Sequence, residues 1–92
     1  MKTSTEQRKI LTEAIKDKDG IIIVTETMGA FTVQTNEINL SENASAREIA
    51  TWKDAIQGLL RNSYIEHYMS GPNFILTKNG WDLGDAISAG KL

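Results

Sequence analysis

The stretch WKDAIQGLLRNSYIEHYMSGPNFILTKNGWDL, which runs from Trp52 to Leu83, decides the fold of this chain. It begins with apolar residues at helical spacing, continues through two short β-type runs around a Gly-Pro turn, and ends in a second helical pattern. This order predicts a helix, a short hairpin and a helix that pack as one unit. No motif of known catalytic chemistry lies within it.

The helix at the start of this stretch is expected to form the centre of the core. Ser45 and Glu48 have the spacing of a capping box, which predicts that the helix begins there. Asn62 and Ser63 end the pattern, and Gly58 lies too close to that end to divide the segment, so one long helix is expected. The apolar stripe along it consists of Ala46, Ile49, Ala50, Trp52, Ile56, Leu59 and Leu60.

A second hairpin and a last helix are predicted after Asn62. The strands are expected at residues 64–69 and 73–76, with Phe74 and Leu76 on one face. Thr77 is a good N-cap for a helix that carries Leu83 and Ile87 inward. Within that helix, Gly80 and Gly84 allow close approach of a neighbouring element. Trp81 is expected to close the edge of the core.

The N-terminal segment predicts another amphipathic helix that begins near Thr5. Either Ser4 with Gln7 or Thr3 with Glu6 has capping-box spacing. Residues 17–20 end the helix, because Gly20 can adopt a positive φ and aspartate side chains favour turns. The apolar face consists of Ile10, Leu11, Ala14 and Ile15.

Residues 21–27 and 31–35 predict a β-hairpin around Met28-Gly29-Ala30. The run Ile21-Ile22-Ile23-Val24 favours a strand covered on both faces, whereas Phe31 and Val33 alternate with polar residues and share one face. A turn at Asn36-Glu37 could lead Ile38 and Leu40 into a short edge strand. The order that we expect omits this strand and is α-β-β-α-β-β-α, an α+β fold with two antiparallel hairpins packed on helices.

Composition limits the function classes. With 92 residues the chain is expected to be a single domain over residues 1–92, with its core at about residues 5–88. The net charge of -2 gives no long-range attraction to DNA or to an anionic membrane, and the absence of cysteine excludes disulfides and thiolate metal sites. No signal peptide or long apolar run is present, so a cytoplasmic location is expected.

Much of the chain resembles the winged-helix modules of bacterial proteins. The similar segments are Arg47-Glu48-x-Ala50-x-Trp52-x-x-Ala55-Ile56, Leu59-Leu60-x-x-x-Tyr64-Ile65-Glu66 and Leu76-Thr77-x-x-Gly80-Trp81-x-Leu83. The first hairpin, with Gly20-Ile21-x-x-Val24-x-x-Thr27-Met28-Gly29 and Val33-Gln34-Thr35-Asn36, is similar to that of small uncharacterised modules appended to larger prokaryotic proteins. The resemblance implies a winged-helix-like fold and brings no catalytic or ligand-binding residues.

The chain departs from a DNA-reading winged helix in two respects. Such proteins place a helix-turn-helix before the wing, but no turn is predicted between Ser45 and Arg61. The predicted wing also lacks positive charge, because no lysine or arginine occurs between Arg61 and Lys78. A wing without cations is a poor phosphate clamp.

The residues that could carry chemistry do not form an active site. His67 is the sole histidine, and Asp82 and Asp85 lie where a helix dipole stabilises carboxylates. The glycines are dispersed and form no phosphate loop. We therefore expect no enzyme activity, no cofactor, no metal site and no small-molecule substrate.

Two functions remain open. One is protein binding or self-association through Tyr64, Tyr68 and Ile75, or through the edge of the first hairpin. The other is DNA binding, in which the phosphate contacts would be Arg47, Lys53, Arg61 and Lys78. The sequence leaves open the partner, the oligomeric state and whether the chain is a domain of a longer protein.

Overall fold

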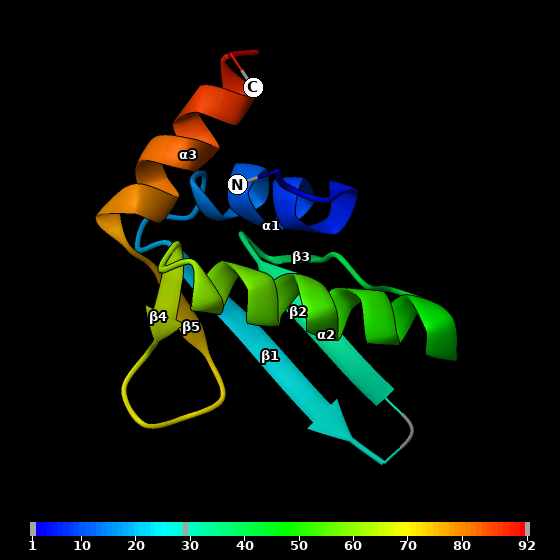
Figure 1. Ribbon diagram of the computed structural model, residues 1–92. Coiled ribbons are helices and arrows are strands. Elements are labelled where there is room, and N and C mark those ends of the chain that lie inside the picture. Colours follow the sequence, from blue (N-terminus) through cyan, green and yellow to red (C-terminus); the bar gives the residue numbers. More distant parts are fainter. Residues whose placement is uncertain (1, 29, 92) are drawn as a thin grey trace.

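Both predicted hairpins belong to one antiparallel sheet (Figure 1). The computed structural model describes residues 2–28 and 30–91, so the predicted turn residue Gly29 lies outside the described residues. The described elements, in chain order, are α1 (Thr5–Ala14), β1 (Ile21–Thr27), β2 (Ala30–Thr35), β3 (Ile38–Asn39), α2 (Ala46–Arg61), β4 (Ile65–His67), β5 (Phe74–Leu76) and α3 (Lys78–Ser88). The predicted α+β class is confirmed.

The strand order across the sheet is β3-β2-β1-β5-β4. The β1–β2 ladder is long and runs from Ile22 opposite Thr35 to Thr27 opposite Ala30. The ladder between β1 and β5 is short, since it pairs only Ile21 with Ile75 and Ile22 with Phe74. Strand β1 therefore continues well past the point where β5 leaves it.

The predicted element order was wrong in omitting β3. The turn residues Asn36 and Glu37 both have positive φ, 52° and 63°, and this reverses the chain onto β2. Leu40 then donates its N–H to the carbonyl of Val33 at 2.8 Å. The short edge strand that the turn at Asn36-Glu37 suggested is therefore present, but with only two residues its periodicity was too weak to include it in the expected order. The complete order is α-β-β-β-α-β-β-α.

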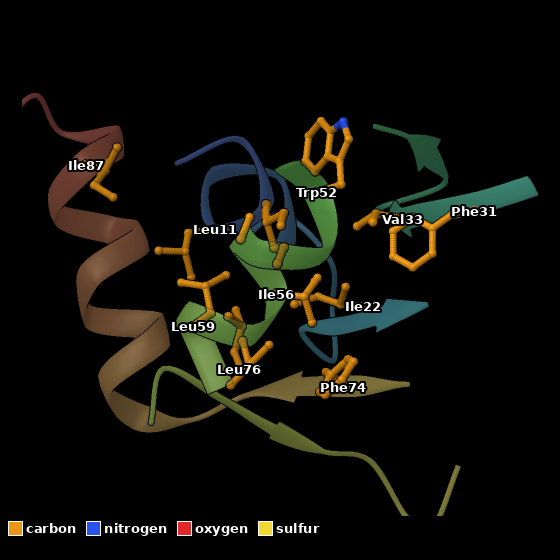
Figure 2. Packing of buried hydrophobic residues seen from close by; sticks show 14 residues of the cluster. Leu11, Ile22, Phe31, Val33, Trp52, Ile56, Leu59, Phe74, Leu76 and Ile87 are labelled. Carbon is orange, nitrogen blue, oxygen red and sulfur yellow. The ribbon is translucent and has the colours of Figure 1, made fainter. Parts of the chain in front are cut away.

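Helices α1 and α2 cover one face of the sheet, and α3 packs against α1 (Figure 1). Figure 2 shows Leu59 and Ile56 of α2 directed toward Ile22 of β1 and Leu76 of β5. The core of the described residues consists of Ile10, Leu11, Ala14, Ile22, Phe31, Val33, Trp52, Ala55, Ile56, Leu59, Ile65, Phe74, Leu76 and Ile87. It contains both faces predicted for Phe31 with Val33 and for Phe74 with Leu76.

The predicted helix starts are confirmed. Ser4 and Gln7 form the capping box of α1, and Ser45 and Glu48 form that of α2. The hydroxyl of Thr77 accepts the N–H of Gly80 at 3.1 Å at the start of α3. Helix α2 is uninterrupted from Ala46 to Arg61, as the absence of an internal turn signal predicted.

Two glycines of α3 allow the close contacts predicted for them. A methyl group on Gly80 would collide with the backbone carbonyl of Tyr64, at the start of the second hairpin. On Gly84 it would meet Ile15 and the carbonyl of Leu11 on α1. The missing side chains thus let α3 pack directly on the backbone of two neighbouring segments.

The prediction that β1 is covered on both faces was wrong. Ile22 is fully buried, but the side chain of Ile23 is 41% exposed. The reason is that α1 and α2 lie on the same side of the sheet, and no described element covers the other side. A run of four β-branched residues cannot distinguish such a strand from one between two layers.

Candidate interaction surfaces

The sheet face turned away from α1 and α2, hereafter the open face, carries a row of isoleucines. Side chains alternate along a strand, so Ile21 and Ile23 point away from the buried Ile22. Ile75 lies directly opposite Ile21 across the β1–β5 ladder and is half-buried. Three isoleucines from two strands therefore share this face.

The structure brings the predicted interface residues only partly together. Tyr64 and Tyr68 lie at the two ends of the β4–β5 ladder, where the carbonyl of Tyr64 accepts the N–H of Thr77 and the N–H of Tyr68 bonds Asn73. Tyr64 packs against the core, and both tyrosines are half-buried. Ile75 lies on the neighbouring strand β5, opposite Glu66, which is midway between the two tyrosines. Ile21 and Ile23 were not predicted as interface residues, because β1 was expected to be covered on both faces.

The edge of β1 is open beyond β5. Even-numbered residues of β1 direct their backbone groups toward β5, as shown by the Gly20 carbonyl, which accepts the N–H of Leu76 at 3.0 Å. Ile22 pairs with Phe74, and beyond it the N–H of Val24 donates to the side-chain Oδ1 of Asn73 at 3.1 Å. Within the described residues, the Val24 carbonyl and both backbone groups of Glu26 have no strand beside them.

Hollows flank this open edge on both faces of the sheet. One, of about 420 Å³, lies over Ile23, Thr25, Pro72 and Asn73. The other, of about 280 Å³, lies on the helix-covered face and is lined by Val24, Glu26, Phe31, Lys53, Ile56, Gln57, His67, Pro72 and Phe74. The gap between residues 24–27 of β1 and Pro72-Asn73 of the β4–β5 loop is hereafter the slot.

The charges at the slot neutralise each other. Lys53 Nζ lies 2.6 Å from the carboxylate of Glu26 and 5.3 Å from the ring centroid of Phe31. The ring of His67 lies 4.8 Å from that of Phe74, centroid to centroid. His67 is exposed apart from this contact with Phe74. The helix-side wall of the slot is therefore mainly aromatic and aliphatic, and the Glu26–Lys53 ion pair lies at its rim.

The four predicted DNA contacts are spread over the molecule. Arg47 and Arg61 lie near opposite ends of α2, so about 21 Å of helix axis separates them. Lys53 is held by Glu26, and Lys78 Nζ lies 2.8 Å from the carboxylate of Asp82. The hydrogen bond and charge of Asp82 raise the pKa of Lys78. These four side chains form no single basic patch.

The described residues contain no group of three or more histidine, cysteine, aspartate and glutamate side chains placed to hold a metal ion. Among the described helices, none has the length and apolar character needed to cross a membrane. Comparisons of the chain with protein-family models, curated proteins and solved structures found no match.

Proposed function

We propose that this chain is a non-catalytic protein-binding module of winged-helix-like type that acts through the open face of its sheet. The observation that carries the proposal is the row formed by Ile21, Ile23 and Ile75, on a face that no described element covers. Ile23 exposes 41% of its surface. Ile21 and Ile75 are half-buried, and apolar residues that gather on one accessible face are typical of protein interfaces.

Exposed methionines support the same proposal. Met28 follows β1, and Met69 lies in the β4–β5 loop. Both side chains are exposed, and both loops lie at the same end of the sheet, because β4 runs parallel to β1 on the far side of β5. Methionine is flexible and polarisable, which suits it to adaptable binding surfaces.

DNA binding is the alternative, and the geometry supports it less. A phosphate clamp needs several cations on one face, since each neutralised phosphate contributes separately to affinity. Here Lys53 and Lys78 are engaged by carboxylates, and Arg47 and Arg61 lie far apart on α2. The β4–β5 hairpin supplies no lysine or arginine to the wing position.

Site-specific photo-crosslinking tests the proposed function. A photoreactive amino acid replaces Ile23 on the open face or, as a matched control, exposed Ala50 on the outer surface of α2. In cells that express the chain, position 23 should give a discrete protein adduct, which can be a second copy or another protein, and position 50 should not. Nucleic-acid adducts, or the same result at both positions, would contradict the proposal.

A further inference from the structure

We infer that the slot beside β1 accepts one extended peptide strand, which pairs antiparallel with residues 24–26 and extends the line of β5. This inference deepens the proposed function, because it names the kind of partner segment. The first argument is the unpaired backbone. The Val24 carbonyl and the N–H and carbonyl of Glu26 all face the slot, and a strand edge of this kind is a template for strand addition.

Asn73 already mimics the first contact of such a strand. Its side-chain Oδ1 accepts the Val24 N–H at 3.1 Å, in the place where the carbonyl of a paired residue would lie. The chain uses the same device on the opposite edge of the hairpin, where the Ser41 hydroxyl accepts the N–H of Val33 and donates to the carbonyl of Phe31. On that side β3 and Ser41 cover the edge. On the β1 side, β5 and the Asn73 side chain satisfy the backbone only as far as the Val24 N–H.

The shape of the slot selects a single strand. Pro72 lines the hollows on both faces of the sheet and bounds the slot opposite Val24 and Glu26. The β4–β5 loop stands on the side of the slot away from β1, where the second strand of an inserted hairpin would have to lie. The outer edge of β4 is also unpaired, but it is three residues long and has no opposing wall. One extended segment of another polypeptide is the occupant that fits.

The walls of the slot specify alternating side chains. Peptide residues opposite Val24 and Glu26 point to the same face as those residues, toward the hollow beside Phe31, Ile56 and Phe74. Apolar β-branched residues fit there. The Glu26–Lys53 ion pair leaves no net charge to be matched, so the segment needs none at these positions. The intervening residues lie beside Thr25 on the open face and can be polar.

The test uses blocked heptapeptides of alternating valine and threonine in an NMR titration of the full chain. The unmodified peptide should shift the amide signals of residues 24–27 and 73–74. A peptide N-methylated at its valines cannot donate to β1 and should bind at least about tenfold more weakly, whereas one N-methylated at its threonines should bind unchanged. Equal binding of both methylated peptides, or no shifts at millimolar concentration, overturns the inference.

A protein variant provides an independent test. Glu26→Pro removes an N–H that faces the slot and leaves the ladder to β2 intact, because the odd-numbered residues of β1 form that ladder. It should fold and lose peptide binding by about tenfold or more, while Glu42→Gln, at an exposed glutamate outside the slot, should retain binding. If the proline variant fails to fold, the methylated peptides alone decide. If no peptide binds but position 23 still gives a protein crosslink, the inference of a peptide-binding slot is overturned and the proposed function stands.

Discussion

The side-chain amide oxygen of Asn73 accepts a hydrogen bond from the backbone N–H of Val24 at 3.1 Å, across 49 positions of sequence. This contact lies where β1 and β5 separate, and it ties the β4–β5 loop to the middle of the first hairpin. Beyond it, β1 has no partner on this side among the described residues. Asn73 therefore marks the limit of the paired sheet and the beginning of the slot.

Replacement of Asn73 by alanine should destabilise the fold by about 0.5–1.5 kcal/mol. The Val24 N–H loses its partner, but water in the adjoining hollow can reach it, so the full cost of a buried unpaired donor is not expected. Urea unfolding followed by circular dichroism measures the change. Asn79→Ala, at an exposed residue in the first turn of α3, is the control and should change stability by less than about 0.5 kcal/mol. Equal effects of the two substitutions would contradict the prediction.

Gly80→Ala should be strongly destabilising although alanine favours helices. The new methyl group would collide with the carbonyl of Tyr64, which also accepts the N–H of Thr77 at 3.1 Å. Because the clash is with backbone, the resulting shift of α3 should cost about 3 kcal/mol, the upper end for overpacking, which outweighs the roughly 1 kcal/mol gained in helix propensity. Thermal unfolding measures the effect. Gly71→Ala, where no atom lies within 4 Å of the added methyl group, should be nearly neutral, and a similar loss in both variants would count against the steric explanation.

Local signals in the sequence were sufficient for the parts of the fold that depend on neighbouring residues. The capping pairs Ser4 with Gln7 and Ser45 with Glu48 each predicted a helix start, and the structure confirms both. The close approach at Gly80 and Gly84 followed from the missing side chains. The capping pairs could be predicted because their two residues lie within four positions of each other. The close approach could be predicted because glycine has no side chain to prevent it.

Sheet assembly could not be predicted in the same way. The pairing of Ile21 with Ile75 joins segments 54 residues apart, and no local pattern specifies it. For this reason the two hairpins were expected as separate units, and β1 was expected to be covered on both faces. The slot was missed because Asn73 was expected only as the first residue of a strand. Its role as a partner for Val24 becomes visible only when the sheet is assembled.

Glu48→Gln should reduce the loss of stability in acid. The N–H and side chain of Ser45 hydrogen-bond the carboxyl group and hold the pKa of Glu48 below its usual value. Because the pKa is lower in the folded state, this stabilisation is complete above the unfolded pKa of about 4.3 and is lost as pH falls through the folded pKa. Glutamine keeps a capping contact without titrating.

The measurement for this variant is the free energy of unfolding between about pH 5 and pH 3, where the slope should be shallower than in the parent chain. Stability at neutral pH should change little. The matched control is Glu42→Gln, at an exposed glutamate in the loop before α2. This control should leave the pH dependence of the free energy of unfolding unchanged. If it reduced that dependence as much as Glu48→Gln does, the loss of one negative charge, and not the helix cap, would be the cause.

Duplex DNA should not bind this chain with measurable affinity even at low salt. The two arginines of α2 outside the ion pairs above, Arg47 and Arg61, are about 21 Å apart along the helix, with the carboxylate of Asp54 between them in sequence. Of the four predicted phosphate contacts, only these two arginines lie outside the ion pairs, so few phosphates could be neutralised together and any binding should be weak with a shallow salt dependence. Fluorescence anisotropy of a labelled duplex of about 20 base pairs at about 50 mM salt measures binding. Salt-sensitive binding that disappears in the double variant Arg47→Glu with Arg61→Glu, but persists in a Lys9→Glu control on α1, would establish DNA contact by α2 and overturn the prediction.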